Sequence, residues 1–326
     1  MAQITLKQLR YVEALARQKH FGRAAETCAV SQPALSMKIK ELEDSLGIAL
    51  FERGPRAIRP TPLGEAFVAR ASDILRAVEE LNDLARAARS GLSGRLRIGI
   101  IPTIAPYLLP ELVGNLTRLY PGLDIHVRET LTPGLIQELA DGKLDTAIVA
   151  LPLSESAFTE VALFEENFVL VRPQKDAGQP VPHAEALREM RLLLLEEGHC
   201  FRDQALSFCS ITASQPKEGL DGSTLSTLVQ MVGAGIGVTL IPEMAVSVET
   251  RSAPVAIARF KAPEPSRTVG MIWRRSSPLA PQLTKVAEVV RQSAHSLKAR
   301  DKREAYASRP TPVAKAAASL SNPFSS

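Results

Sequence analysis

Two cysteines, Cys200 and Cys209, stand nine residues apart in the second half of the chain. A cysteine thiolate can attack a peroxide to give a sulfenic acid, which a second thiol converts to a disulfide. Cys200 lies shortly after the expected strand 191–195 and at the start of a segment that is expected to be helical, so backbone N–H groups and the helix dipole would stabilise its thiolate. His199 and Arg202 could add positive charge beside the sulfur. These residue types are suited to redox sensing.

The spacing of the pair sets a geometric condition. If Cys200 and Cys209 lie at opposite ends of one helix, nine residues place them about 13 Å apart. A disulfide needs Cα atoms about 5.5–6 Å apart, so the bond could form only if the helix unwinds, and such refolding is a switch. The spacing alone also fits two small buried side chains, which is the role expected for the third cysteine, Cys28.

The segments around the cysteine pair alternate between strand-like and helix-like patterns after a hinge at 91–94. Strands are expected at 96–101, 125–129, 146–150, 168–172, 191–195, 238–241, 255–260 and 268–273. Helices are expected at 107–120, 133–142, 184–190, 201–209, 224–232 and 281–296. This alternation predicts an α/β body with a mostly parallel sheet.

The first 61 residues have a different pattern. Helices are expected at 6–16, 23–28 and 31–45, and short strands of a hairpin wing at 49–53 and 57–60. Ser31 is a good N-cap for the third helix, and Gly47 stops it. This order predicts an N-terminal all-α winged helix-turn-helix.

The third of these helices carries the residues expected to contact DNA. Short polar side chains at its N-terminal end can enter the major groove, where Gln32 could pair with adenine, while arginines of the wing can meet phosphates. The expected set is Ser31, Gln32, Pro33, Ser36, Lys38, Lys40, Arg53 and Arg56, with Arg59 as a further wing cation. Each cation alone could be a solvated surface charge, but double-stranded DNA is the partner expected for the set.

A long helix is expected from about 61 to 89. Apolar residues recur along it every seven residues at Phe67, Ile74, Leu81 and Ala88, with Ala71, Val78 and Ala85 between them. This heptad seam favours a helix dimer, although the same pattern fits an amphipathic helix that lies on its own domain.

The composition sets the wider limits. With 326 residues, 45% of them hydrophobic and 23% charged, the chain is long enough for two or three globular domains. Residues 1–62 hold ten Lys and Arg against six Asp and Glu, which suits contact with nucleic acid. No apolar run reaches about 18 residues and the start lacks a signal-peptide pattern, so a cytoplasmic location is expected. No cofactor and no metal is expected.

The N-terminal motifs resemble those of the LysR-type transcriptional regulators. The match runs through Phe21-Gly22-Arg23-Ala24-Ala25, Val30-Ser31-Gln32-Pro33-Ala34-Leu35-Ser36, Leu50-Phe51-Glu52-Arg53 and Thr61-Pro62-Leu63-Gly64 at fixed spacings. The resemblance implies promoter DNA as the partner, self-association as a dimer and then a homotetramer, and contact with RNA polymerase on the nucleoid.

The same resemblance implies the domain organisation. A winged helix-turn-helix would occupy 1–61, a linker and dimerisation helix 62–90, and a disordered tail 301–326. Between them, a periplasmic-binding-protein-like α/β regulatory domain would occupy 94–300. Its two subdomains would be about 94–164 with 270–300, and about 165–269.

Within this family the chain is similar to the members that sense peroxide. The run Gly198-His199-Cys200-Phe201-Arg202-Asp203-Gln204, with a second cysteine at Cys209, carries that similarity. It implies that hydrogen peroxide oxidises Cys200, that Cys209 resolves the product to an intramolecular disulfide, and that local refolding changes the transcription of oxidative-stress genes. It also implies a peroxide pocket made by Thr103, Thr132, His199 and Arg267.

Two other functions fit parts of the pattern. A regulator of the same family could bind a small organic metabolite, with the cysteines incidental. A thiol peroxidase fused to a DNA-binding domain would share the cysteine chemistry, but the sequence holds no thioredoxin-like Cys-x-x-Cys and no Gly-rich nucleotide loop. A regulator rather than an enzyme is therefore expected.

Overall fold

A computed structural model of the chain describes residues 4–54, 58–87, 92–153, 155–183, 186–208 and 221–307. The chain divides into two compact units, residues 1–90 with 277–279 and residues 91–276 with 280–326. The N-terminal unit combines helices with a two-stranded sheet, and the C-terminal unit is built on a nine-stranded sheet. None of the helices in the described ranges has the length and apolar content of a membrane span.

Three helices form the N-terminal end of the chain, namely α1 (Leu6–Gln18), α2 (Phe21–Thr27) and α3 (Gln32–Leu46). Helix α2 begins earlier than expected, because the ring of His20 accepts the N–H of Gly22 at 3.1 Å and so caps the helix. Helix α3 has the expected ends. Ser31 Oγ accepts the N–H of Ala34, and Gly47 ends the helix in the left-handed conformation at φ +68°.

The wing is attached to α3 by a carboxylate. Strands β1 (Phe51–Arg53) and β2 (Ile58–Pro60) pair antiparallel, as expected of a hairpin. Glu43 on α3 accepts the N–H groups of Leu50 and Phe51 at 2.8 and 3.1 Å. Because Leu50 and Phe51 also belong to the buried core of this unit, the wing starts from a fixed position on α3.

The long helix α4 (Pro62–Ala87) follows the wing. Phe67 packs against the core of the N-terminal unit and Ala71 is buried, whereas Ile74 and Leu81 are 48% and 64% exposed. The heptad seam therefore has two parts. Its first turns lie on their own domain, and its later turns present an apolar stripe to the outside of the described chain.

The sheet of the C-terminal unit is mixed. In spatial order its strands run β4-β3-β5-β11-β6-β9-β7-β8, with β10 paired to β6. Their bounds are β3 (Gly94–Ile100), β4 (Leu123–Glu129), β5 (Thr146–Leu151), β6 (Phe158–Pro173), β7 (Leu192–Leu195), β8 (Asp221–Gly222), β9 (Val238–Pro242), β10 (Val255–Ala258) and β11 (Ser266–Arg274).

The expectation of a mostly parallel sheet is wrong. Strands β3, β4 and β5 are parallel to one another, as are β7, β8 and β9. The long strands β6 and β11, however, pair antiparallel with each other and with their other neighbours. The sequence suggested only the end of β6, because its first half carries acidic residues that interrupt the apolar pattern.

The helices of the C-terminal unit are α5 (Ala105–Leu119), α6 (Thr132–Ala140), α7 (Cys200–Phe208), α8 (Leu225–Gly233), α9 (Val246–Glu249) and α10 (Ala280–Ala307). The 3-10 turns are η1 (Gln174–Asp176), η2 (Ala186–Arg188) and η3 (Glu243–Ala245). The helix expected at 184–190 is reduced to η2. Helix α10 continues to Ala307, past the expected start of a disordered tail, and residues 308–326 lie outside the described ranges.

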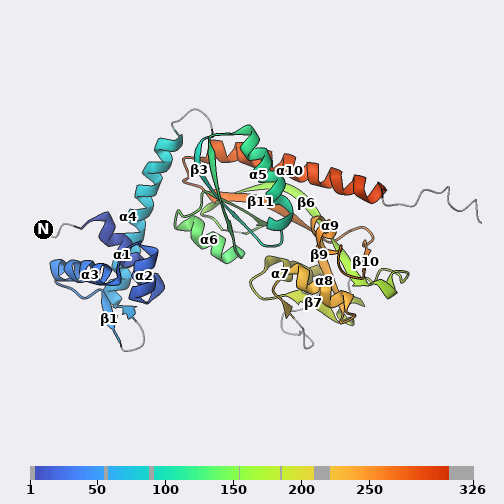
Figure 1. The fold of residues 1–326 in the computed structure, drawn as a ribbon, viewed down its shortest axis with the longest axis horizontal. Helices are drawn as coiled ribbons and strands as arrows, with labels where there is room; N and C mark the ends of the chain where they lie inside the picture. Colours follow the sequence, from blue (N-terminus) through green and yellow to red (C-terminus); the bar gives the residue numbers. More distant parts are fainter. Residues whose placement is uncertain are drawn as a thin grey trace, which may run out of the picture. The chain divides into compact units, whose positions relative to one another are not determined.

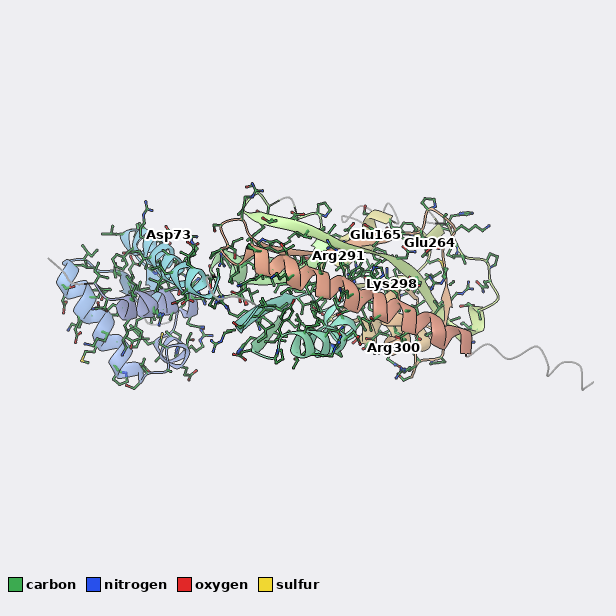
Figure 2. The ribbon with its side chains drawn as sticks, turned by 90° about the horizontal axis from the view of Figure 1, so that it is seen from above. Asp73, Glu165, Glu264, Arg291, Lys298 and Arg300 are labelled. Carbon is green, nitrogen blue, oxygen red and sulfur yellow. The ribbon has the colours of Figure 1, made fainter. Side chains whose placement is uncertain are left out.

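The C-terminal unit has two α/β subdomains joined by crossing strands. The first holds β3–β5 with α5, α6 and α10, and the second holds β7–β10 with α7–α9; β6 and β11 run between them (Figure 1). Helix α10 is attached to β6 by side chains labelled in Figure 2. Arg291 Nη2 donates to the carbonyl of Ala162 at 2.8 Å, and Lys298 Nζ donates to that of Glu165 at 2.5 Å.

Candidate functional site

Cys200 is the first residue of α7, at the point where the chain leaves β7. Gly198 lies between the two elements at φ +94°, a conformation that favours glycine. In the first turn of a helix, backbone N–H groups have no partner within the helix and attract an anion. The half-buried thiol of Cys200 therefore stands at the strand-to-helix junction that the sequence predicts.

A narrow cavity lies beside Cys200. The space between its atoms, counted together with the adjoining open solvent, is about 170 Å³, and it admits a water-sized molecule only if the lining residues move apart. The lining residues come from the β3–α5 loop, the start of α6 and the β7–α7 turn, and they are Ile101, Pro102, Thr103, Leu131, Thr132, Gly198, His199, Cys200 and Phe201. The structure thus brings three of the four expected pocket residues, Thr103, Thr132 and His199, around the sulfur.

The two threonine hydroxyls in this cavity differ. Thr103 Oγ1 accepts a hydrogen bond from Arg267 Nη1 at 2.8 Å. Thr132 Oγ1 is buried and has no hydrogen-bond partner among the described residues. A buried hydroxyl without a partner costs about 1–3 kcal/mol, a cost that a small polar ligand in the cavity would remove. This arrangement is suited to a ligand such as a peroxide.

The fourth expected residue, Arg267, reaches the cavity indirectly. It is buried, and its guanidinium forms an ion pair of 2.6 Å with Glu166 while it holds Thr103. It also lies over the ring of Phe201, 5.6 Å from the centroid. The expected cation beside the sulfur is therefore a compensated charge that acts through Thr103. Sequence reasoning missed Glu166, because the polar run 165–167 gives no sign that its middle residue is buried.

The two cations expected next to Cys200 have other roles. Burial lowers the pKa of His199, although the nearby Glu196 opposes the shift, so the ring is neutral at pH 7. Arg202 Nη1 donates to the carbonyl of Leu195 at 2.7 Å and pairs with Asp221 at 3.0 Å. Arg202 therefore ties α7 to the end of β7, and its charge is shared with a carboxylate.

His199 gives the folded chain a pH dependence. Because burial lowers the pKa of His199 below its ordinary value near 6.5, the unfolded chain takes up this proton at a higher pH than the folded chain. The free energy of unfolding should therefore fall as the pH drops below about 6.5. Replacing His199 by Gln should reduce this fall between about pH 7 and about pH 5, measured by denaturant unfolding. The exposed His295→Gln control should match the wild type, and an unaltered slope in His199→Gln would contradict the assignment.

The other cysteines are placed differently. Cys209, the expected resolving thiol, lies outside the described residues, which reach Phe208 at the end of α7. Cys28 caps the end of α2. Burial raises the pKa of the Cys28 thiol, and the charge of Glu13 adds to the shift. Cys28 is therefore a small, partly buried side chain packed against the core of the N-terminal unit, where the sequence predicts a buried one.

The residues expected at a DNA interface lie on the outer surface of α3. Gln32, Pro33, Lys38 and Lys40 are exposed and Ser36 is half-buried, while Ser31 Oγ is used in the helix cap. Lys38 pairs with Glu41 at 2.7 Å. Of Arg53 only the backbone in β1 is described, Arg56 lies outside the described residues, and Arg59 is exposed on β2. Sequence reasoning did not include Met37, which is 54% exposed on the same helix.

A winged helix-turn-helix, followed by a long helix and an α/β body of two subdomains, defines a bacterial transcriptional regulator. Residues 6–65 match the family described as "Bacterial regulatory helix-turn-helix protein, lysR family", and residues 89–295 match "LysR substrate binding domain". The chain belongs to the LysR family. That family is one of DNA-binding regulators rather than enzymes, which excludes the thiol peroxidase alternative.

Within the family, the chain is similar to proteins named OxyR. The "DNA-binding transcriptional dual regulator OxyR" of Escherichia coli K12 is 40% identical over 291 residues, covering 88% of this chain and 95% of that protein. The "Probable hydrogen peroxide-inducible genes activator" of Streptomyces viridosporus is 41% identical over 305 residues, covering 91% and 97%.

Solved structures give the same similarity. A full-length OxyR from Pseudomonas aeruginosa with a Cys-to-Asp substitution has a TM-score of 0.68 at 39% identity, and covers 89% of this chain and 96% of that one. A Cys-to-Ser OxyR from Corynebacterium glutamicum, described as H2O2-bound, has a TM-score of 0.63 at 35% identity, and covers 91% and 94%. In the described part of this chain, no group of three or more His, Cys, Asp or Glu is placed to hold a metal ion.

Proposed function

We propose that this chain is a transcriptional regulator that senses hydrogen peroxide through Cys200. The observation that carries the proposal is the position of Cys200 at the start of α7, in one cavity with Thr103 and with the unpartnered hydroxyl of Thr132. The names of the similar proteins support the same oxidant. Two hydroxyls and a helix N-terminus favour a small polar molecule beside a thiolate.

The proposed reaction has two steps. The thiolate of Cys200 attacks one oxygen of H2O2, the O–O bond breaks, and the products are a sulfenic acid on Cys200 and hydroxide. The thiol of Cys209 then attacks the sulfur of the sulfenic acid, which gives the Cys200–Cys209 disulfide and releases water. The two electrons that reduce the peroxide come from the two sulfurs, so no cofactor is needed.

The disulfide step requires α7 to change. Cys200 is the first residue of this helix, and Cys209 follows its last described residue, Phe208. A regular helix of this length separates its ends by about 13 Å, whereas a disulfide needs about 5.5–6 Å between Cα atoms. Unwinding of α7 is therefore the proposed link between oxidation and a change in DNA contacts.

The remaining parts of the chain fit promoter binding. Gln32, Pro33 and Ser36 of α3 would face base edges, and Lys38, Lys40 and the wing arginines would face phosphates. The exposed stripe at Ile74 and Leu81 of α4 would form a dimer, and contacts between C-terminal units would make the tetramer. The regulator would act in the cytoplasm on nucleoid DNA and contact RNA polymerase to activate oxidative-stress genes.

A non-reducing peptide mass map tests this function. Before peroxide, Cys200 and Cys209 should be free thiols, and after a stoichiometric addition of H2O2 their peptides should be joined. Cys28 should stay reduced, because burial raises the pKa of its thiol. If neither Cys200 nor Cys209 reacts faster than a free thiol, the sensor function is wrong.

A second candidate function is suggested by a larger neighbouring cavity. It has a volume of about 490 Å³ with the adjoining open space, and it lies between the subdomains beside Tyr107, Glu129, His199 and Glu249. Tyr107 donates its hydroxyl to Glu249 across this space at 2.7 Å. A regulator of the same family that responds to a small organic metabolite would use this cavity, and it would answer to that metabolite without oxidation of Cys200.

The proposed DNA interface predicts that two kinds of substitution weaken DNA binding in different ways. Gln32→Ala should lose about 1–3 kcal/mol of binding free energy on the DNA site that the wild type selects, and should relax sequence choice. Lys40→Ala, like Arg53→Ala, should weaken binding to all sequences alike and reduce the steep dependence on salt. Titrations on selected and random duplexes at two salt concentrations measure both. Equal losses on the two duplexes for Gln32→Ala would remove it from the residues that read bases.

A further inference from the structure

Glu166 is a buried carboxylate in the middle of β6. It is 1% exposed, and in the strand register it lies directly opposite Arg267 of β11. Its Oε2 atom accepts from Arg267 Nε at 2.8 Å and pairs with Nη2 at 2.6 Å. Its Oε1 atom accepts the backbone N–H of Met244 at 3.2 Å. Glu166 therefore fixes the guanidinium at the point where the two crossing strands pass between the subdomains.

The guanidinium of Arg267 in turn holds Thr103, which lines the cavity beside Cys200. Nη1 donates to Thr103 Oγ1 at 2.8 Å, and Nη2 donates to the carbonyl oxygen of Thr103 at 3.1 Å. Because the charged guanidinium of Arg267 donates to Oγ1, the hydroxyl proton of Thr103 cannot point towards Arg267. The side chain of Thr103 also lines the cavity, so this proton is available to a molecule there. In this arrangement Thr103 is an oriented hydrogen-bond donor.

We infer that Glu166 is a positioning residue for the reaction of Cys200 with peroxide. By holding Arg267 against Thr103, it sets the Thr103 hydroxyl to donate a hydrogen bond to a peroxide oxygen in the cavity. Charge develops on the oxygen that leaves as hydroxide, and a donor fixed before the reaction stabilises that charge without reorganisation. This inference rests on the proposed function of Cys200.

The test compares two rates in the full-length protein with Cys209→Ser, in which the first oxidation can be followed by mass spectrometry of the Cys200 peptide. One is the second-order rate constant with H2O2, and the other is the rate of alkylation by iodoacetamide at its high-pH plateau. Glu166→Gln and Thr103→Val should each lower the peroxide rate by roughly 10- to 100-fold. Alkylation, which needs no donor for a leaving oxygen, should change by less than about threefold.

The double variant and a matched control make the test specific. Because Glu166 acts through Thr103, the Glu166→Gln/Thr103→Val protein should be no slower than the slower single variant. Glu165→Gln makes the same change at the exposed neighbouring position, whose carboxylate accepts from Thr268 at 2.6 Å, and should keep the wild-type rates. Losses that multiply in the double variant, or an equal fall in alkylation and peroxide rates, would overturn the inference.

Glu166→Asp serves if Glu166→Gln does not fold, because it keeps the charge beside Arg267 and shortens the side chain by one methylene. A lower peroxide rate in folded Glu166→Asp with unchanged alkylation supports the positioning role, and wild-type rates refute it. Failure of the proposed function is seen separately. In that case the wild-type Cys200 itself reacts with H2O2 no faster than a free thiol, before any variant is compared.

Discussion

Replacing Cys200 by serine is expected to abolish the response to hydrogen peroxide. A serine hydroxyl at the start of α7 stays protonated at neutral pH and is a poor nucleophile towards the O–O bond, so no oxidised species can form there. Transcription from a peroxide-responsive promoter in cells that carry this variant should stay at the unstressed level. The same protein should keep its fold and bind DNA, because Cys200 is only half-buried.

The Cys209→Ser protein should behave differently from Cys200→Ser. It should still react with peroxide but stop at a sulfenic acid on Cys200, or proceed to sulfinic and sulfonic acids, because the resolving thiol is missing. A reagent that traps sulfenic acids, followed by mass spectrometry, separates the two variants. Cys28→Ser is the matched control and should respond as the wild type does. Trapping on Cys209 in Cys200→Ser at the wild-type rate would reverse the two roles.

Placing aspartate at both Ile74 and Leu81 is expected to remove one of the contacts through which the protein assembles. These side chains form the exposed part of the α4 stripe, and an unpaired carboxylate buried in an apolar helix interface costs several kcal/mol. A tetramer that uses this contact should fall to a dimer, measured by sedimentation. The apparent affinity for a two-site promoter should drop by about 100-fold or more, because the two reading helices no longer bind as one unit.

Asn82→Asp is the control for this pair, since it adds the same charge at an exposed position next to Leu81. It should leave both the mass and the affinity unchanged. An Ile74→Asp/Leu81→Asp protein with the wild-type mass would show that the exposed stripe does not mediate assembly. The two aspartates should not unfold the N-terminal unit, because the part of the seam that packs on its core is Phe67 and Ala71.

Local signals made much of the fold predictable from the sequence. The ends of α3 follow from the side chain of Ser31 and the left-handed conformation of Gly47, which are properties of single residues. The resemblance to the family predicted Thr103, Thr132 and His199 near Cys200, and the structure gives the reason: each follows the end of a strand, and such ends meet at one edge of a sheet.

The features that the sequence did not reveal depend on contacts between distant segments. Glu166 reads as part of an exposed acidic run, and it is buried only because Arg267, about a hundred residues later, lies opposite it in the sheet. Arg202 was expected to face Cys200, but the carbonyl of Leu195 and the carboxylate of Asp221 hold it instead. The sequence shows the sign of a residue's charge, but only the folded structure shows which residue becomes its partner.

The crossing of β6 and β11 has a mechanical consequence. These two strands connect the subdomains, and the register of their pairing shifts at Gly270, three residues from Arg267. If one subdomain rotates against the other about these strands, the residues near Glu166 and Arg267 lie at the pivot and are displaced least. The strands at the two ends of the sheet, β4 and β8, lie farthest from this pivot and would move farthest in such a rotation. A change of a few atoms near the pivot, such as oxidation of Cys200, would in this way produce a large movement at the outer strands.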